Sequence, residues 1–537
     1  CYALLADSTS NGTDNTAQVK NLWLELKETD DACAGAAEQL LKSRSIFHTS
    51  PAEAMVWQRA RLGMENNRPR VVTQAVGLLS PSSVDIASAV YANPAQYLSE
   101  KLTAFQPKTR EIVSLALIRL AQQDAAAAAA EMGKLRWKAQ LTQEERDWIW
   151  GVIGKRAAMK LDRAAADYFA NGQFTAMHDD HLAWAARAAL RVERWQQVQA
   201  AIEAMSEAQR SDPTWVYWRA RAMLKSPNVT DAIRAQANQL LQSIASSRGF
   251  YEQLAMEELG QRITAPLRPP ALTPAEKESA AHNAGLVRAL YAIRMGLRPE
   301  GVREWNYVIN LHTKGGMDDR SLLAAADFAC KYEIWDRCIN TSERTKTVID
   351  AEQRFLMPFK ASVVARSQQI GMDAAYVYGL IRQESRFILD AKSTVGASGL
   401  MQLMPATAKW TAKRIGLTNF QPRDVHDKDI NIALGTSYLQ VVLGSFENSM
   451  PMAAAAYNAG PGRVRVWRGQ VGDPTIDAAI WAENIPFNET RDYVKKVLSN
   501  TVNYAALLTA QPQSLKARLG TVGPKNPTVP EAIPNLP

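Results

Sequence analysis

The chain has 537 residues, of which 47% are apolar and 22% charged, and its formal net charge is +8. This length predicts more than one domain with a well-filled core and excludes a peptide or a disordered tail. No uninterrupted apolar run approaches the roughly 20 residues that a bilayer crossing needs, so we predict no transmembrane segment. Residues 351–537 carry 20 basic against 14 acidic side chains. Such a basic region suits an anionic polymer: nucleic acid, an acidic membrane surface or an acidic glycan.

The chain begins at Cys1, so its start is either processed or trimmed. A lipoprotein also begins with cysteine, but residues 2–6 have the pattern of an apolar helical turn rather than of a polar tether, and we favour trimming. The four cysteines form two close pairs, Cys1 with Cys33 and Cys330 with Cys338. This spacing fits two short-range disulfides between neighbouring helices, and it fits four buried free thiols almost as well.

Residues 1–265 are rich in alanine, leucine, glutamine and arginine, which predicts helix throughout. Trp150, Trp184 and Trp218 recur with a period of 34 residues, and alanines follow the last two at Ala188 and Ala222. A period of this length with a large aromatic and a small residue is typical of stacked helical hairpins. We therefore expect an α-superhelical solenoid, right-handed, over residues 1–265.

Four prolines within residues 265–274 interrupt the helical pattern, since no helix interior can hold them. They predict a linker, followed by a small helical linker domain over residues 275–350. From residue 351 glycines separate shorter helical stretches, which predicts a further α-rich domain over residues 351–522. Five prolines in residues 523–537 predict an extended tail.

A glutamate lies on the apolar face of a predicted helix in this last domain. The helix begins at Asp373, its apolar stripe includes Val377 and Ile381, and Glu384 follows seven residues after Val377. A carboxylate on a core face is costly unless it is paired, hydrogen-bonded or protonated. If it is protonated, burial makes Glu384 a general acid; the alternative is a salt bridge, for example to Arg386.

Three later stretches put polar side chains at corners between helices and loops. Residues 395–405 form a glycine loop that leads into a helix starting at Pro405. Residues 454–462 and 481–487 form two further corners. The side chains that these stretches present are Gln402, Met404, Tyr457, Asn458 and Glu483. Each has a structural explanation when taken alone: core filler, half-buried aromatic, helix cap or solvated loop charge.

In this order, the segments Glu384-Ser385, Gly399–Gln402 and Ala455–Gly460 match the three motifs of the family 1 lytic transglycosylases, which have goose-type-lysozyme-like catalytic domains. The segment Glu483–Val494 resembles the stretch that closes this domain in the large soluble members. Those enzymes carry a superhelical domain and a small linker domain before the catalytic domain. The same layout follows here from the repeat and the proline break.

The resemblance implies cleavage of the β-1,4 bond between N-acetylmuramic acid and N-acetylglucosamine in peptidoglycan, leaving a 1,6-anhydromuramyl end. Most glycosidases need two carboxylates. In the lytic reaction the sugar's N-acetyl carbonyl stabilises the cationic centre and its C6 hydroxyl attacks, so one carboxyl group suffices. Glu384 would act first as general acid and then as general base.

The resemblance also implies roles for the other residues. Tyr457 would hydrogen-bond Glu384, and Glu483 would face the stem peptide from the edge of the pocket. Ser393, Gln402 and Met404 would line the muramyl subsite, and Asn458 would contribute to the same pocket or fix its corner.

Two alternative functions stay open at this point. A goose-type lysozyme uses a similar scaffold for hydrolysis, which requires a second acid or an ordered water, and Glu483 is the one candidate acid. A non-catalytic peptidoglycan-binding scaffold would use the solenoid as an interaction surface. In that case a Glu384→Gln variant would keep its biological effect.

We expect no nucleic-acid binding, because the basic residues are scattered and no helix-turn-helix signature occurs. We expect no cofactor and no metal, because histidines spaced like His178 and His181 near a helix start are more often caps and surface groups. Peptidoglycan glycan strands and stem peptides are the expected partners, and the solenoid is a candidate surface for cell-wall synthesis or division proteins. Peptidoglycan and disulfides together indicate the periplasm of a Gram-negative bacterium, with outer-membrane association if the precursor is lipidated.

Overall fold

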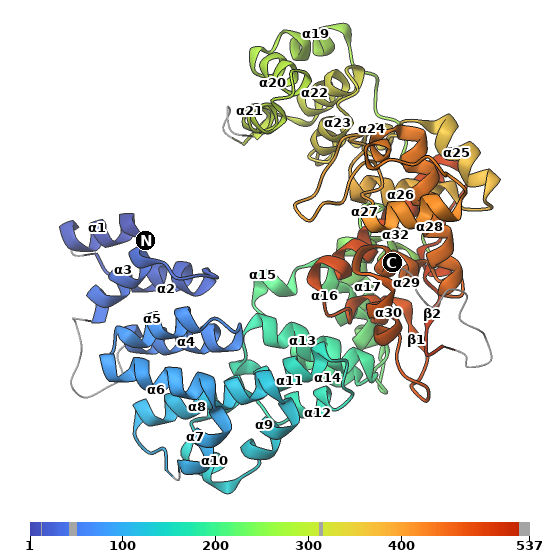
Figure 1. Ribbon diagram of the computed structural model, residues 1–537. Coiled ribbons are helices and arrows are strands. Elements are labelled where there is room, and N and C mark those ends of the chain that lie inside the picture. Colours follow the sequence, from blue (N-terminus) through green and yellow to red (C-terminus); the bar gives the residue numbers. More distant parts are fainter. Residues whose placement is uncertain (12, 42–50, 102, 311–314, 526–537) are drawn as a thin grey trace. The chain divides into compact units, whose positions relative to one another are not determined.

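The computed structural model describes residues 1–11, 13–41, 51–101, 103–310 and 315–525. These residues are mainly helical, and their one sheet pairs two short antiparallel strands, so the prediction of a mainly α fold is confirmed (Figure 1). The chain forms two compact units, residues 1–215 and 216–537. The boundaries expected near residues 265–275 and 350 both fall inside the second unit, and the division into three domains stays a prediction.

The described part of the first unit consists of helices, the longest of which have 17 residues (Figure 1). Prolines in the first turns of α5 to α8 help to start these helices, since a first-turn residue needs no backbone donor. The helices of this unit are α1 (Tyr2–Asn11), α2 (Thr16–Glu25), α3 (Asp31–Leu41), α4 (Pro51–Glu65), α5 (Pro69–Gly77), α6 (Pro81–Ala92), α7 (Pro94–Glu100), α8 (Pro107–Gln123), α9 (Ala125–Met132), α10 (Leu135–Gln140), α11 (Gln143–Met159), α12 (Ala165–Phe169), η1 (Phe174–Ala176), α13 (Asp179–Arg191), α14 (Trp195–Glu203) and α15 (Glu207–Arg210).

The 34-residue period corresponds to successive helical hairpins. Trp150 lies in α11, which packs against α12 and α13, and Trp184 lies in α13, which packs against α14. Both tryptophans are buried, as is Ala188 one turn after the second. Trp218 begins the next copy in α16 (Pro213–Leu224), which spans the boundary between the units. The helical-hairpin repeat is thus confirmed in both of these copies.

A buried charge cluster joins α4, α11 and α13. Lys155 Nζ lies 2.6 Å from Glu65 Oε1 and 2.5 Å from Asp180, and His181 Nε2 lies 3.1 Å from Glu65 Oε2. His181 is fully buried, so the expectation that it is a cap or surface group is wrong, whereas the half-buried His178 is the N-cap residue of α13. The spacing could not reveal the burial because the partner, Glu65, lies 116 residues away. The Lys155 ammonium group gives Glu65 a cationic partner.

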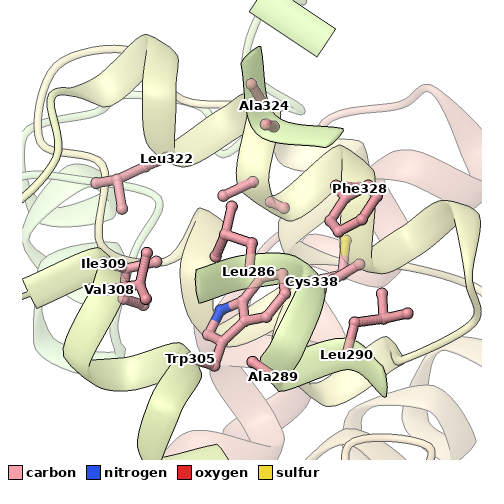
Figure 2. Close-up of a cluster of buried hydrophobic side chains, with 14 residues drawn as sticks. Leu286, Ala289, Leu290, Trp305, Val308, Ile309, Leu322, Ala324, Phe328 and Cys338 are labelled. Carbon is pink, nitrogen blue, oxygen red and sulfur yellow. The ribbon is translucent and has the colours of Figure 1, made fainter. Parts of the chain in front are cut away.

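The second unit begins with the end of α16, α17 (Asp231–Ile244) and α18 (Phe250–Glu258). Residues 264–273 contain no helix, which confirms the predicted proline break. Thr273 then starts α19 through a capping box with Glu276. The following helices are α19 (Pro274–His282), α20 (Ala284–Arg294), α21 (Arg298–Asn310), α22 (Asp319–Lys331) and α23 (Trp335–Ser342), and Figure 2 shows their shared core around Trp305 and Phe328.

The rest of the second unit holds the segment that resembles a catalytic domain. Its longest helix, α32, packs along α26 (Figure 1). The elements are α24 (Ala351–Arg354), α25 (Lys360–Gln369), α26 (Ala374–Glu384), α27 (Pro405–Arg414), η2 (Pro422–His426), α28 (Lys428–Ser445), α29 (Met450–Ala459), α30 (Pro461–Trp467), β1 (Ile476–Asp477), α31 (Ala478–Glu483), α32 (Asn488–Thr509), α33 (Leu515–Leu519) and β2 (Thr521–Val522).

All four cysteines form disulfides, in the pairs expected. Cys1–Cys33 ties the start of the chain to α3, and Cys330–Cys338 ties α22 to α23, with Cα atoms 4.9 and 5.2 Å apart. The alternative of four free thiols is therefore wrong. Of the predicted proline-rich tail, residues 526–537 lie outside the described residues. Within the described part of the chain, no helix combines the length and apolar character needed to cross a membrane.

Candidate active site

Glu384 is the last residue of α26. Asp373 caps the start of this helix by accepting a hydrogen bond from the Ala375 backbone N–H at 2.8 Å, as predicted. Directly after the helix, Arg386 and Phe387 both adopt left-handed backbone conformations, with φ of 50° and 67°. Such residues are costly and cluster at functional sites. The chain therefore turns sharply away from the helix and leaves the Glu384 carboxyl group at the helix end.

A close helix contact supplies the hydrogen-bond partner of Glu384. A side chain at Gly379 would collide with Thr501 Oγ1 and the Val497 carbonyl of α32, so glycine allows α26 and α32 to approach closely. The Tyr493 hydroxyl, on the same helix α32, donates to Glu384 Oε1 at 2.5 Å. Tyr493 is itself buried. Because of this contact the glutamate is held in one orientation.

The surroundings of Glu384 favour its protonated form. Burial raises the pKa of its carboxyl group to about 8, the Tyr493 hydrogen bond opposes this rise, and the charge of Glu489 adds to it. Among the described residues, no cation lies within ion-pair distance of Glu384. The negative end of the α26 dipole further disfavours an anion here. A carboxyl group that is still protonated near neutral pH can donate a proton to a leaving group.

Tyr457 lies beside Glu384 but does not make the expected hydrogen bond. Its hydroxyl instead donates to the Met401 carbonyl at 2.8 Å, and its ring packs against Tyr438 with the ring centroids 5.5 Å apart. Burial and the charge of Glu384 both raise the pKa of Tyr457, which shows that the two groups are neighbours. Tyr457 therefore ties the glycine loop to α29, while Tyr493 holds the acid.

The glycine loop is held by hydrogen bonds of its own. Gly399 has φ of 79°, and a Cβ there would collide with the Asn431 amide, whose Oδ1 accepts from the Met401 backbone N–H at 2.9 Å. Gln402 donates through Nε2 to the carbonyls of Ala391 and Gly399, at 3.0 and 2.8 Å. The amide nitrogen of Gln402 thus shapes the loop.

Three further predicted residues lie around this loop. Ser393 Oγ accepts from the Ala397 backbone N–H at 2.9 Å and closes a turn. Met404 precedes α27 and is 42% exposed, available to a ligand. Asn458 Oδ1 accepts from Thr490 Oγ1 at 2.7 Å and so joins the end of α29 to the start of α32. The Asn458 hydrogen bond thereby ties α29 to the helix that carries Tyr493, whereas the hydrogen bonds of Ser393 and Gln402 stay within the loop.

Glu483 does not lie at a pocket edge, and this expectation is wrong. Its side chain is fully buried and accepts from the Tyr251 hydroxyl at 2.5 Å and from Lys495 Nζ at 3.2 Å. Arg491 Nε lies 4.0 Å away. The Trp218 indole N–H in turn donates to the Tyr251 hydroxyl at 3.1 Å. Glu483 therefore joins α16, α18, α31 and α32 and is closed to a ligand.

Sequence reasoning missed two residues of the site, Tyr493 and Glu489. Both lie in the segment Glu483–Val494 that was identified by resemblance. Glu489 is exposed, and its charge acts on the Glu384 carboxyl group. A spacing of four on a predicted helix indicates that the two side chains share a face. That signal was available, but the partner of Tyr493 lies 109 residues away and could not be read from local pattern.

Residues 362–480 match the family model described as the transglycosylase SLT domain, and residues 484–513 match the soluble lytic transglycosylase helical domain. The soluble lytic murein transglycosylase of Escherichia coli strain K12 is 28% identical over 511 residues, which cover 93% of this chain and 75% of that protein. The Salmonella typhimurium protein of the same name is 28% identical over 498 residues, 90% of this chain and 73% of its own.

Solved structures agree over nearly the whole chain. An inactive Glu-to-Gln mutant of the lytic transglycosylase Slt from Pseudomonas aeruginosa matches with a TM-score of 0.73 and 29% identity, covering 95% of this chain and 81% of that one. The 70-kDa soluble lytic transglycosylase of Escherichia coli gives 0.67 and 25%, covering 96% and 80%. The fold and the matched domains define this chain as an enzyme, a lytic transglycosylase. Over most of its length the chain is homologous to the large soluble lytic transglycosylases.

Proposed function

We propose that this enzyme cleaves the β-1,4 bond between N-acetylmuramic acid and N-acetylglucosamine in murein and leaves a 1,6-anhydromuramyl end. The observation that carries the proposal is the Glu384 carboxyl group, with a pKa raised to about 8 by burial. Relatives named as murein transglycosylases supply the substrate class. A single acid of this kind suits a reaction in which no water molecule has to be activated.

In the first step Glu384 donates its proton to the glycosidic oxygen as the bond to the muramyl C1 breaks. The leaving group is the N-acetylglucosamine side of the strand, and the carbonyl oxygen of the muramyl N-acetyl group stabilises the cationic C1. The Tyr493 hydroxyl then stabilises the Glu384 carboxylate that has formed. The hydrogen bond thus matches the charge that develops on the acid.

In the second step the muramyl C6 hydroxyl attacks C1, and its proton returns to Glu384. This closes the 1,6-anhydro ring and restores the starting form of the enzyme, with no water consumed. For the binding of the sugar we propose the half-buried loop residues Ser393 and Gln402, the exposed Met404, and Asn458 at the end of α29.

The test is mass spectrometry of the fragments that the protein and its Glu384→Gln variant release from purified murein. We expect fragments one water lighter than hydrolysis products from the wild type, and a loss of turnover of about 10²–10⁴-fold in the variant. Glu352→Gln, at an exposed glutamate of the same unit, is the matched control and should keep wild-type turnover. Unchanged turnover in Glu384→Gln would rule out this mechanism.

Hydrolysis is the second candidate function, and one observation favours it. Glu483 is buried and cannot activate water, but the exposed Glu489 acts electrostatically on Glu384 and is a possible second acid. If Glu489 activates water, Glu489→Gln should lose at least about 10²-fold in turnover and the wild-type products should be hydrated. Anhydro products, with only a modest effect of Glu489→Gln, favour the lytic reaction.

We also propose that the enzyme works in the periplasm. Both disulfides form, which requires an oxidising compartment, and the relatives are named for action on murein. Cell fractionation with non-reducing electrophoresis checks this. Reduced cysteines in protein taken from cells, or recovery in the cytoplasmic fraction, would contradict it.

A further inference from the structure

Two histidines and a glutamate meet in the first unit. Glu65 is the last residue of α4, His178 is the N-cap residue of α13, and His181 lies in the first turn of α13. Each side chain offers one ligand atom, and the three atoms all lie within 4.8 Å of one another. Imidazole nitrogens and carboxylate oxygens are ligands that Zn²⁺ takes in proteins, so the group has the chemistry of a zinc site.

The spacing of the three atoms fits a tetrahedral ion. His181 Nε2 lies 3.1 Å from Glu65 Oε2, and His178 Nε2 lies 3.8 Å from the same oxygen. The two imidazole rings pack against each other with their centroids 3.5 Å apart. Zinc–ligand distances of about 2.0–2.1 Å put two ligand atoms of a tetrahedral site roughly 3.3 Å apart. Small side-chain movements therefore suffice to bring the three atoms around one ion.

The packing of the histidines leaves the right nitrogen of each ring for an ion. His181 Nδ1 faces α11, where a side chain at Gly151 would collide with it, so Nε2 is the nitrogen that points to Glu65. His178 Nε2 is buried and has no hydrogen-bond partner among the described residues. A buried polar atom of this kind costs free energy, and coordination to an ion would remove that cost.

The Glu65 carboxylate is fixed by the groups around it. Its second oxygen, Oε1, pairs with Lys155 Nζ at 2.6 Å, which leaves Oε2 for the histidines. Lys155 also pairs with Asp180 at 2.5 Å, so a second carboxylate offsets the ammonium charge. Arg156 donates to the backbone carbonyl of Glu65 and not to its carboxylate. Groups that orient a ligand in this way without touching the ion are usual around metal sites.

The site is open to solvent on one side and competes with no thiolate. The His178 side chain is 29% exposed, whereas Glu65 and His181 are buried. All four cysteines form disulfides, so the one other group of close ligand atoms, around Cys1 and Cys33, cannot bind through its sulfurs. The expectation that no metal binds rested on the spacing of the two histidines, which does not show that the fold brings Glu65 to them.

We propose that Glu65 Oε2, His178 Nε2 and His181 Nε2 bind one Zn²⁺ ion, and that the ion ties the end of α4 to the start of α13. A metal that binds the folded chain and not the unfolded one stabilises the fold. Zn²⁺ fits better than Mg²⁺ or Ca²⁺, because those ions prefer sites made of oxygen ligands alone. The proposal is independent of the reaction at Glu384.

The first test is calorimetric titration with Zn²⁺ of the whole protein, freed of metal by a chelator and then dialysed. The wild type should have one tight site, and His178→Gln should weaken it at least about 100-fold, because loss of a ligand costs more than loss of an outer partner. His178 is chosen because it is half-buried, so its replacement disturbs the fold least.

His282→Gln, at an exposed histidine of α19, is the matched control and should bind Zn²⁺ as the wild type does. Equal affinities of the wild type and His178→Gln, or no binding by the wild type, would overturn the proposal.

Thermal unfolding then tests whether the ion ties the helices, and it checks that the variant folds. Without metal, His178→Gln should melt within about 2 °C of the wild type. Zn²⁺ at about 100 times its dissociation constant should raise the melting temperature of the first unit by about 5–10 °C in the wild type. The same concentration of Zn²⁺ should raise it by less than about 2 °C in His178→Gln. An equal rise in the two proteins, or none in the wild type, would contradict the proposal.

Co²⁺ in place of Zn²⁺ reports the geometry of the site, because a tetrahedral Co²⁺ ion absorbs visible light much more strongly than a six-coordinate one. The wild type with Co²⁺ should show visible bands that added Zn²⁺ removes, and His178→Gln should lack them. Bands of equal intensity in His178→Gln would place the ion elsewhere and overturn the assignment.

Discussion

Two glutamates, the fully buried Glu65 in the first unit and the half-buried Glu384 in the second, have opposite electrostatic surroundings. Burial disfavours the charge of both. At Glu65 the interactions with His181 and Lys155 outweigh burial and hold the pKa of the carboxyl group well below its usual value. Because burial lowers the pKa of His181 itself to about 4, Lys155 carries the positive charge of this pair near neutral pH. At Glu384 no cation among the described residues opposes burial, and the pKa rises to about 8. The difference shows that burial alone does not define the role of a carboxyl group, and that the cations around it decide between a structural anion and an acid.

The two glutamates also differ in what their surroundings allow. Lys155 pairs with both the buried Glu65 and the exposed Asp180, so the first cluster is a set of paired charges that holds three helices together. Glu384 has one neutral donor, Tyr493, at the end of a helix. An acid in such a place loses and regains a proton without breaking an ion pair.

The largest effect should come from removing the cationic partner of Glu65, so that Glu65, like Glu384, has no ammonium group beside it. A Lys155→Met variant leaves a buried carboxylate without its ammonium partner, and we expect a loss of about 3–5 kcal/mol from the unfolding free energy of the first unit. Lys134→Met, at a lysine that is 54% exposed, is the matched control and should cost at most about 1 kcal/mol. Thermal unfolding measures both, and equal midpoints would contradict this view of the cluster.

A second, smaller effect concerns the donor to Glu384. Tyr493→Phe removes the hydrogen bond that lowers the Glu384 pKa, so the alkaline limb of kcat/KM should move up by about one pH unit. We also expect kcat to fall about tenfold, because the carboxyl group loses its fixed orientation. Tyr457→Phe, which removes the bond to the Met401 carbonyl, should leave the limb in place. A shift in Tyr457→Phe alone would reverse the two assignments.

The raised pKa of Glu384 should also lower the stability of the folded protein at alkaline pH. The Glu384 pKa, about 8 in the folded protein against an ordinary 4.5, means that stability falls as pH rises from 4.5 to 8, since the folded state holds the proton more tightly. Glu384→Gln should therefore equal the wild type at pH 4 and melt about 2–4 °C higher at pH 9. Thermal scans at the two pH values check this, and a variant less stable at pH 9 would mean that the carboxylate is stabilised by the fold.

The smallest expected effect has the opposite sign to that of Tyr493→Phe. Glu489→Gln removes a negative charge that raises the Glu384 pKa, so the alkaline limb should move down by about a few tenths of a pH unit. Because Glu489 is exposed, the shift should shrink in high salt. An upward movement would show that Glu489 acts on Glu384 by another route.

The sequence predicted those features that depend on local pattern. The helix start at Asp373, the break after α18 and the helix start at Pro405 all follow from residues close in the chain, and the structure has them. Glu384 was placed on a buried stripe by its spacing from Val377. The match of Glu384-Ser385 to a family motif then distinguished Glu384 from a glutamate in an ordinary salt bridge.

The errors have a common cause in partners that lie far along the chain. The local sequence around Pro486 predicts that Glu483 is a solvated loop charge. In the structure Glu483 is buried and accepts a hydrogen bond from Tyr251, which lies 232 residues earlier. The local sequence predicts that His181 is a surface group, because only the fold brings Glu65 to it. The roles of Tyr457 and Tyr493 also depend on partners that lie far along the chain. Only the packing of α29 and α32 shows which hydroxyl donates to Glu384.

Helix α32 limits where the chain can be cut to produce an isolated catalytic fragment. The match to the transglycosylase domain ends at residue 480, yet Tyr493 lies beyond it and Lys495 connects the same helix through Glu483 to Tyr251 on α18. A fragment cut at residue 480 would keep its acid and lose the group that orients it. A fragment that starts after α18 would leave Glu483 without its phenol. The shortest fragment that keeps the arrangement around Glu384 is therefore defined by these hydrogen bonds rather than by the limits of the matched domain.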